Sequence, residues 1–291
     1  MEPVGVAMAL GTAFLWALTS VAMRRATATA EVSPVAASAV ASLMGLVIAL
    51  VATLAELSAG REFHALDGGL VEAVAAGALV FGIGRLLWYY GISKIGASRS
   101  NAIAASETLI APLVAIILAG ESPSVLVLTG GAMIAAGVAT VSLQRNGGSS
   151  GNEWTVGVAA SVGAALSFAL GATYARIANV AIGSPFLTTL ISTATSLSMM
   201  LLLTARTGGL RRALGNGYAL AGSLANGLAS VLFWGSLYLA PVSVAVPLTQ
   251  TYPLFTLMIT LGFAKALERV DAWTAVGAVA VTVGAVMVTA S

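Results

Sequence analysis

The sequence predicts an all-α integral membrane protein whose ten transmembrane helices form two inverted five-helix repeats. Three observations lead there: a composition poor in charge, ten long apolar segments, and a second half that repeats the first. Of the 291 residues, 58% are hydrophobic and 8% are charged, whereas a soluble domain carries about 25% charged residues. So few polar groups cannot cover a surface in water, and we therefore expect a lipid bilayer around the chain.

Ten segments are long enough to cross the bilayer, which takes about 20 mostly apolar residues in a helix. They are residues 4–23, 34–54, 70–92, 97–118, 125–143, 155–175, 185–205, 217–239, 242–263 and 272–290. The polar run from Arg145 to Asn152 is typical of a flexible linker. We therefore expect a first repeat over residues 1–144, a linker over 145–153 and a second repeat over 154–291.

The two halves resemble each other in two separate blocks. A shift of 152 residues aligns Gly5, Gly11 and Arg24, with several residues between them, to Gly157, Gly163 and Arg176. Further on, Glu121, Gly130 and Gly137 match Glu268, Gly277 and Gly284. Because each half holds five helices, the second half would enter the membrane upside down, as in the inverted repeats of secondary transporters. Glu121 and Glu268 fall at helix ends, where we expect them to cap a helix or to lie in a loop.

The chain resembles the drug/metabolite transporter superfamily, in particular the EamA-like ten-helix group. The resemblance is carried by the five-plus-five repeat and by the spacing of Glu121 from Gly130 and of Glu268 from Gly277. It also rests on Trp88-Tyr89-Tyr90-Gly91, Phe233-Trp234-Gly235 and Pro253-Leu254-Phe255. It implies a basket of ten helices with a central cavity that opens alternately to each side. It also implies substrates such as amino acids, other metabolites or amphipathic toxic compounds.

Two ionisable residues, Arg85 and Glu107, fall near the middle of the bilayer. Arg85 precedes the turn near Ile95 by ten residues and Glu107 follows it by twelve, so both lie roughly 15–18 Å from that turn at 1.5 Å per residue. Charges at this depth are costly and mark either structural pairs or transport sites. One interpretation is therefore an ion pair that joins two helices. The other is a translocation site, in which Arg85 holds a carboxylate or phosphate and Glu107 holds an amine or a proton.

Aromatic and amide side chains complete the candidate substrate-binding site. Phe81, Trp88 and Tyr89 share a helix face with Arg85, although an interfacial aromatic belt would also account for Trp88 and Tyr89. Asn226 and Gln250 lie within membrane segments, where they either join helices through hydrogen bonds or face a ligand. Trp16 and Tyr252 are placed too deep for an interfacial belt, and either pack in the core or line the cavity.

The side of the membrane on which the termini lie stays open. The resemblance implies cytoplasmic termini, which would leave Arg61 and Arg176 as the basic residues of the inside loops. The positive-inside rule favours the opposite orientation. Both orientations place the two termini on one side.

These observations favour a secondary active transporter, and an exporter in particular, of small organic metabolites such as amino acids or amphipathic compounds. An exchanger of the organophosphate or nucleotide-sugar type, and a membrane scaffold protein without transport, are the alternatives. An enzyme is disfavoured, because the chain has no cysteine and one histidine, His64, in a polar connection. We expect no cofactor, no metal and, with a net charge of +2, no nucleic acid. The expected partners are the lipid bilayer of the plasma (inner) membrane, a small-molecule substrate, protons, and at most a second copy in a homodimer.

Overall fold

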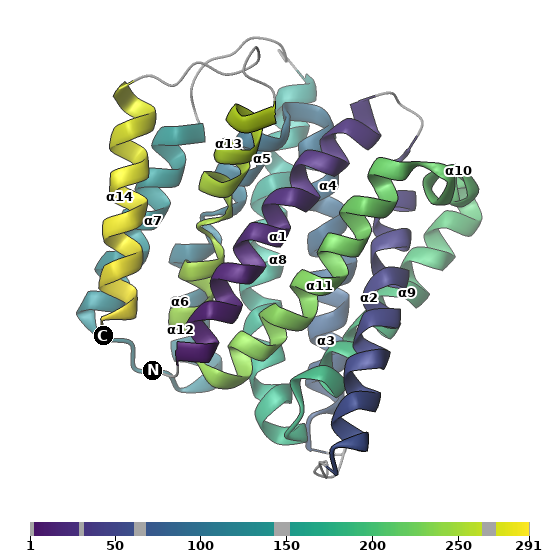
Figure 1. Cartoon of the computed structure of the whole chain (residues 1–291), viewed down its shortest axis with the longest axis horizontal. Helices are drawn as coiled ribbons and strands as arrows, with labels where there is room; N and C mark the ends of the chain where they lie inside the picture. The colour runs from purple at the N-terminus through teal and green to yellow at the C-terminus, as the bar shows by residue number, and fades with distance from the viewer. Residues whose placement is uncertain (1–2, 29–31, 61–67, 143–151, 264–271, 291) are drawn as a thin grey trace.

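The computed structural model describes residues 3–28, 32–60, 68–142, 152–263 and 272–290, and within these ranges every regular element is a helix (Figure 1). The first half contains α1 (Pro3–Ala28), α2 (Pro34–Ser58), α3 (Leu70–Ala76), the π-helical η2 (Gly77–Gly84), α4 (Arg85–Ile95), α5 (Ala97–Ala104), α6 (Glu107–Ala119) and α7 (Val125–Ser142). The second half contains α8 (Asn152–Ile182), α9 (Pro185–Thr207), α10 (Leu210–Gly215), α11 (Gly217–Leu239), α12 (Val242–Thr249), α13 (Tyr252–Phe263) and α14 (Ala272–Thr289). The prediction of an all-α chain is confirmed.

Six helical segments are long and apolar enough to cross a membrane, which supports a multi-pass membrane protein. They are Pro3–Thr27, Pro34–Ser58, Leu70–Ile95, Asn152–Ile182, Pro185–Thr207 and Gly217–Leu239. Shorter apolar helices cover Glu107–Ala119, Val125–Thr140 and Val279–Thr289.

The structure corrects several expected boundaries. The segments 97–118 and 242–263 are each interrupted, at residues 105–106 and 250–251, so neither is one continuous helix. The helix expected from residue 155 begins at Asn152, and the expected linker otherwise lies outside the described residues. The connection after α9 contains the short helix α10, which the polar and glycine-rich sequence there did not reveal.

Serine caps start the second helix of each half in the same way. The Ser33 hydroxyl accepts a hydrogen bond from the backbone N–H of Ala36 at 3.2 Å, and the Ser184 hydroxyl accepts one from Leu187 at 3.0 Å. Each cap is followed by a proline in the first helical turn, where its missing N–H is not needed. A local Ser-Pro signal therefore fixes the start of both α2 and α9.

Large apolar side chains cover the outside of the molecule, while many polar ones are buried inside. Exposed residues include Val51, Leu54, Ile117, Leu202 and Val279. The buried polar set is dominated by serines and threonines, and it includes Asn101, Asn179, Asn226, Gln250, Arg85 and Glu107. This distribution is the reverse of that in a soluble protein and suits a protein solvated by lipid.

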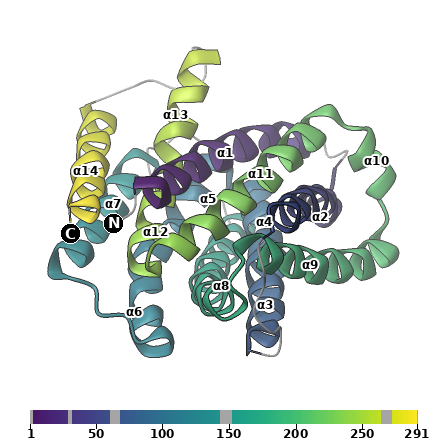
Figure 2. The same cartoon turned by 60° about the horizontal axis from the view of Figure 1, so that its bottom comes forward.

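Each part of the first half packs on a part of the second half. The main pairs are α1 with α11, α2 with α9, α4 with α8, and α7 with α14. Figure 2 shows α7 and α14 together at one side of the bundle, with α2 and α9 at the other. In Figure 1, α1 begins and α14 ends at the same end of the bundle. The two halves are therefore interlocked along their whole length.

The α7–α14 pair is brought together by glycines. A methyl group added at Gly130 would lie 2.7 Å from the carbonyl oxygen of Gly284, and one added at Gly137 would lie 2.6 Å from that of Gly277. Real Cβ atoms do not approach an oxygen so closely, so only glycine fits here. These four residues are the glycines of the second matching block in the sequence.

A carboxylate and an arginine stabilise the turn between α11 and α12. The Glu121 oxygens accept hydrogen bonds from the backbone N–H groups of Val242 at 2.7 Å and Ser243 at 3.0 Å, at the first turn of α12. Arg176 on α8 donates to the carbonyl oxygens of Leu237 and Tyr238 near the end of α11. The capping role expected for Glu121 is confirmed, and Glu268 lies outside the described residues.

Candidate substrate-binding site

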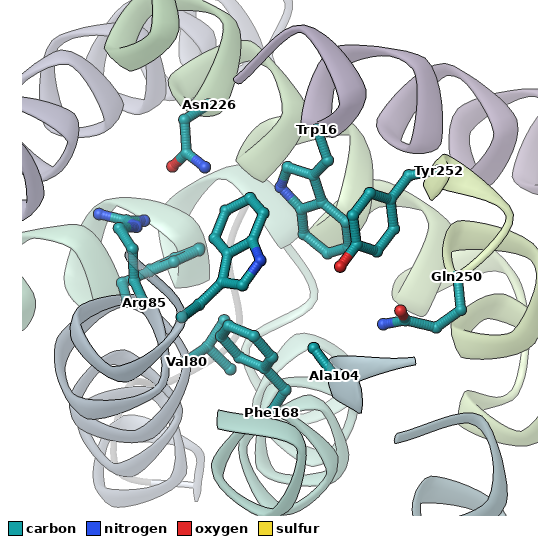
Figure 3. A pocket seen from close by; sticks show the side chains of 10 residues that line it. Trp16, Val80, Arg85, Ala104, Phe168, Asn226, Gln250 and Tyr252 are labelled. Carbon is teal, nitrogen blue, oxygen red and sulfur yellow. The ribbon is translucent and has the colours of Figure 1, made fainter. Parts of the chain in front are cut away.

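A cavity lies between the two halves (Figure 3), with about 400 Å³ of space between its atoms when the part open to solvent is included. Ten residues line it: Trp16, Val80, Phe81, Arg85, Trp88, Ala104, Phe168, Asn226, Gln250 and Tyr252. They come from α1, η2, α4, α5, α8, α11, α13 and the break between α12 and α13. Both repeats expected from the sequence thus contribute to one chamber.

Aromatic rings form half of the lining side chains. The Trp16 ring lies 6.1 Å from the Tyr252 ring and 5.0 Å from the Phe233 ring, measured between centroids. The Trp88 ring meets Tyr252 edge to face at 6.1 Å, and its indole N–H donates to the Asn101 side-chain oxygen at 2.9 Å. Rings held in this way form a rigid apolar surface on which the body of an amphipathic ligand can pack.

Arg85 supplies the positive charge of the cavity. It is the first residue after the π-helical segment, and its side chain is 2% exposed. One guanidinium nitrogen donates to the Ser42 hydroxyl at 3.0 Å, while the other has no hydrogen-bond partner. The guanidinium also lies over the Phe81 ring, 4.7 Å from its centroid. A buried cation with a free donor nitrogen is suited to hold an anionic group.

The Ser42 hydroxyl is itself fixed in place. It lies 2.7 Å from the Ser196 hydroxyl on α9 and donates to the Ser38 carbonyl oxygen at 2.9 Å. The position of Arg85 therefore depends on α2 and α9, two helices from different halves.

Glu107 and Gln250 meet where two helices are interrupted. The first break, at residues 105–106, separates α5 from α6 just before Glu107, and the second separates α12 from α13 at Gln250. The Gln250 amide nitrogen donates to the Glu107 carboxylate, and both side chains are buried. The Gln250 amide oxygen has no partner.

Figure 3 shows how the polar groups are distributed. In this view Arg85 and Asn226 lie at one end of the cavity and Gln250 at the other, with Phe168, Trp16 and Tyr252 between them. The Asn226 side-chain oxygen is buried and without a partner. The cavity therefore has two polar ends separated by an aromatic middle.

Seven of the nine residues chosen from the sequence line this cavity, and two do not. Glu107 contacts Gln250 but does not line the cavity, and Tyr89, one residue further round the helix from Trp88, is fully buried away from it. The expected meeting of Arg85 with Glu107 is wrong: no oxygen of Glu107 lies within 4.0 Å of the guanidinium, which binds Ser42 instead. Matched depth alone did not fix how far each helix is rotated.

Three lining residues were missed in the sequence, namely Val80, Ala104 and Phe168. Val80 and Ala104 are ordinary apolar residues that nothing in the sequence distinguishes. Phe168 is the one large aromatic residue in the middle of its expected span, which was a usable signal.

Residues 3–143 match the model of a family described as the EamA-like transporter family. The first half of this chain belongs to the EamA-like transporter family. The resemblance to the drug/metabolite transporter superfamily is thereby confirmed, and the match implies a membrane transporter of that type.

The fold of nearly the whole chain is similar to that of a solved crystal structure. That structure aligns with a TM-score of 0.77 at 15% sequence identity, covering 99% of each chain. At this identity the likeness concerns the fold alone. No curated protein sequence matched the chain.

Proposed function

We propose that this protein is a secondary active transporter that exports small organic solutes with one anionic group through its central cavity by alternating access. Amino acids and other small amphipathic metabolites are the substrates that the cavity suits best. The observation that carries this proposal is Arg85, a buried cation on the cavity wall with one free guanidinium nitrogen.

The environment of Arg85 lacks a compensating charge. Among the described residues, no carboxylate oxygen lies within 4.0 Å of the guanidinium. Burial of an unpaired charge costs several kcal/mol, and a hydroxyl and an aromatic face offset only part of that. A substrate carboxylate would offset the rest, so ligand binding would stabilise the occupied cavity.

The remaining walls limit the kind of substrate. Among the described residues that line the cavity, Arg85 is the one basic side chain, so a singly charged carboxylate matches the site better than a diphosphate. The rings of Trp16, Trp88 and Tyr252 suit an apolar body. These features favour a metabolite exporter over the organophosphate or nucleotide-sugar type of exchanger.

Several paired contacts support a ten-helix arrangement of two inverted repeats over residues 1–144 and 154–291, joined by 145–153. Arg24 donates to the Ile92 carbonyl oxygen at 3.3 Å, as its counterpart Arg176 does to that of Leu237 at 2.6 Å. In both cases an arginine of the first helix of a half holds the last turn of the third.

The glycine pairs support the same arrangement. Gly130 faces Gly284 and Gly137 faces Gly277, so the order reverses between α7 and α14. A two-fold axis in the membrane plane gives this reversal. We place this transporter in the plasma (inner) membrane, as a monomer or homodimer.

The proposal is tested by flux into liposomes that contain the purified protein. A panel of radiolabelled amino acids, monocarboxylates and organophosphates is screened first, in counterflow with the same unlabelled compound. Arg85→Lys and Arg85→Met should lose transport of every carboxylate that the natural protein carries, because an ammonium does not reproduce the two-pronged donor. Arg211→Met, which removes an exposed arginine on α10, is the matched control.

Thermal unfolding of the same proteins separates binding from stability. Arg85→Met removes an unpaired buried charge together with one hydrogen bond, so its Tm should stay close to that of the natural protein. Full transport by Arg85→Met, or transport confined to compounds without an anionic group, would overturn the proposal.

A further inference from the structure

We propose that Glu107 and Gln250 form a proton-coupling switch, in which protonation of Glu107 reverses the Gln250 amide and so changes the group offered to a substrate ammonium from acceptor to donor. The inference rests on the proposed function, since it concerns the end of the same cavity opposite Arg85. It assigns the driving ion and a second recognition element of the substrate.

The first support is the position of the pair. Glu107 begins α6 directly after one helix break, and Gln250 forms the other break between α12 and α13. Interrupted membrane helices leave backbone groups and side chains free to bind ligands near the middle of the bilayer. The hydrogen bond between these two residues joins the helix breaks of the two halves. A change in the protonation of Glu107 therefore alters the hydrogen bonding of Gln250 at the other break.

The second support is the isolation of the carboxyl group. Within the part of the chain that the structure describes, no Lys, Arg or His nitrogen lies within 4.0 Å of Glu107. Its hydrogen-bond partner is the neutral Gln250 amide. A buried carboxylate without a cation is readily neutralised by a proton, which is how carboxylates in membrane transporters carry protons.

The groups on the neighbouring helices do not replace that proton. The Tyr252 phenol on α13 is an ionisable group that interacts electrostatically with Glu107. α7 and α12 carry no ionisable residue. On α8, Glu153 pairs with Lys94, while Arg176 binds the end of α11; Tyr174, also on α8, packs in the core cluster around Phe81.

The chemistry of the amide provides the switch. The Gln250 Nε2 donates to Glu107 and Oε1 is left without a partner. We assign this orientation of the amide to the ionised form of Glu107, which can only accept hydrogen bonds. Because Gln250 lines the cavity, that oxygen is the atom free to accept from an ammonium group of the substrate. An amide has donors at one end and acceptors at the other. In the alternative orientation, Oε1 therefore faces Glu107 and Nε2 faces the substrate.

Protonation produces that alternative orientation. The Glu107 O–H needs an acceptor, and the amide oxygen supplies it once the Gln250 amide turns over. Nε2 then points its N–H groups at the ammonium, which has no lone pair to accept them, and the substrate loses a contact. One proton bound from one side thus releases one substrate, and loss of the proton on the other side restores the acceptor. This is proton-for-substrate exchange.

The test uses three probes with one common apolar body: leucine, 3-methylbutylamine and 4-methylpentanoate. They carry both charged groups, the ammonium alone and the carboxylate alone. Binding to the purified protein is measured through tryptophan fluorescence, since Trp16 and Trp88 line the cavity. The pH is varied between about 4 and 9, where aliphatic amines stay protonated.

We expect the dissociation constants of leucine and 3-methylbutylamine to rise roughly tenfold per pH unit below the titration point of Glu107, as for competition with one proton. 4-Methylpentanoate should show no such dependence at that residue. Glu107→Gln, which cannot take up a proton, should bind all three probes independently of pH, and Gln250→Met should lose the preference for an ammonium. A dependence that survives in Glu107→Gln, or is equal for all three probes, would overturn the switch.

An infrared measurement keeps the test independent of the probes. In the natural protein without ligand, a carboxylic C=O band that is absent from Glu107→Gln should appear and vanish reversibly within the same pH range. If that band never appears or never vanishes, the proposal is wrong whatever binds. Failure of the proposed function looks different: 4-methylpentanoate would bind equally to the natural protein and to Arg85→Met, while the band would still titrate.

Discussion

Removal of the Glu121 carboxylate should loosen the contact between the α6–α7 connection and α12. Two backbone N–H groups, of Val242 and Ser243, donate to this carboxylate at 2.7 and 3.0 Å. Hydrogen bonds to a charged group contribute about 1.5–3 kcal/mol each, and loss of a helix N-cap costs about 0.5–2 kcal/mol. Because Glu121 is only half-buried, we expect Glu121→Ala to lower the free energy of unfolding by about 2–4 kcal/mol.

The assay is thermal unfolding in detergent, followed by intrinsic tryptophan fluorescence. At about 2 °C per kcal/mol for a chain of this size, Glu121→Ala should lower the Tm by about 4–8 °C. Glu121→Gln keeps one acceptor oxygen and should lose about half as much. Glu72→Ala, which removes a glutamate from the first turn of α3, is the control and should cost about 0.5 kcal/mol through the helix dipole. An unchanged Tm for Glu121→Ala, or an equal loss in Glu72→Ala, would refute this reasoning.

Three further predictions follow from other contacts. Gly77→Ala would place a methyl group 2.3 Å from the Ser192 carbonyl oxygen, so we expect a loss of at least about 2 kcal/mol, measured as a lower Tm or a failure to fold. Lys94→Ala breaks an ion pair with Glu153 at 2.7 Å, but the partners are 30% and 65% exposed, so its Tm should change by less than about 2 °C. Reporter domains fused to the chain ends and inserted between residues 145 and 151 should report opposite sides of the membrane, and the same side would contradict five crossings per half.

The helices were predictable because a bilayer demands long apolar segments, and that demand is visible without tertiary information. Their interruptions were not, since Ala105 and Thr251 carry no strong breaking signal of their own. Pro112, Pro247 and Pro253 lie within α6, α12 and α13, but the breaks fall at residues 105–106 and 250–251 and not at these prolines. Such breaks depend on what the backbone gains from neighbours, which a single sequence does not contain.

Part of the candidate site was predictable, because the free-energy cost of burying a polar side chain in a bilayer marks such residues in the sequence. Arg85, Asn226 and Gln250 were identifiable because a polar group inside a bilayer is costly and is therefore retained for a structural or functional role. Their partners were not, because a helix may turn about its axis without changing the depth of any residue. The π-helical segment before Arg85 adds to this rotation, and so the guanidinium meets Ser42 on α2, while Glu107 meets Gln250 in the other half.

The glycine contact between α7 and α14 has a consequence for motion. Interlocked side chains resist small displacements, because each side chain must leave its rotamer before the helices can move. Where two backbones touch at glycines, few side chains have to change rotamer. By contrast, sliding α2 against α9 would break the hydrogen bond between Ser42 and Ser196. In the alternating access that we propose, the contact between Gly130 and Gly284 can therefore serve as the pivot. A side chain larger than that of glycine would force α7 and α14 apart and remove this pivot, because the two backbones are already in contact.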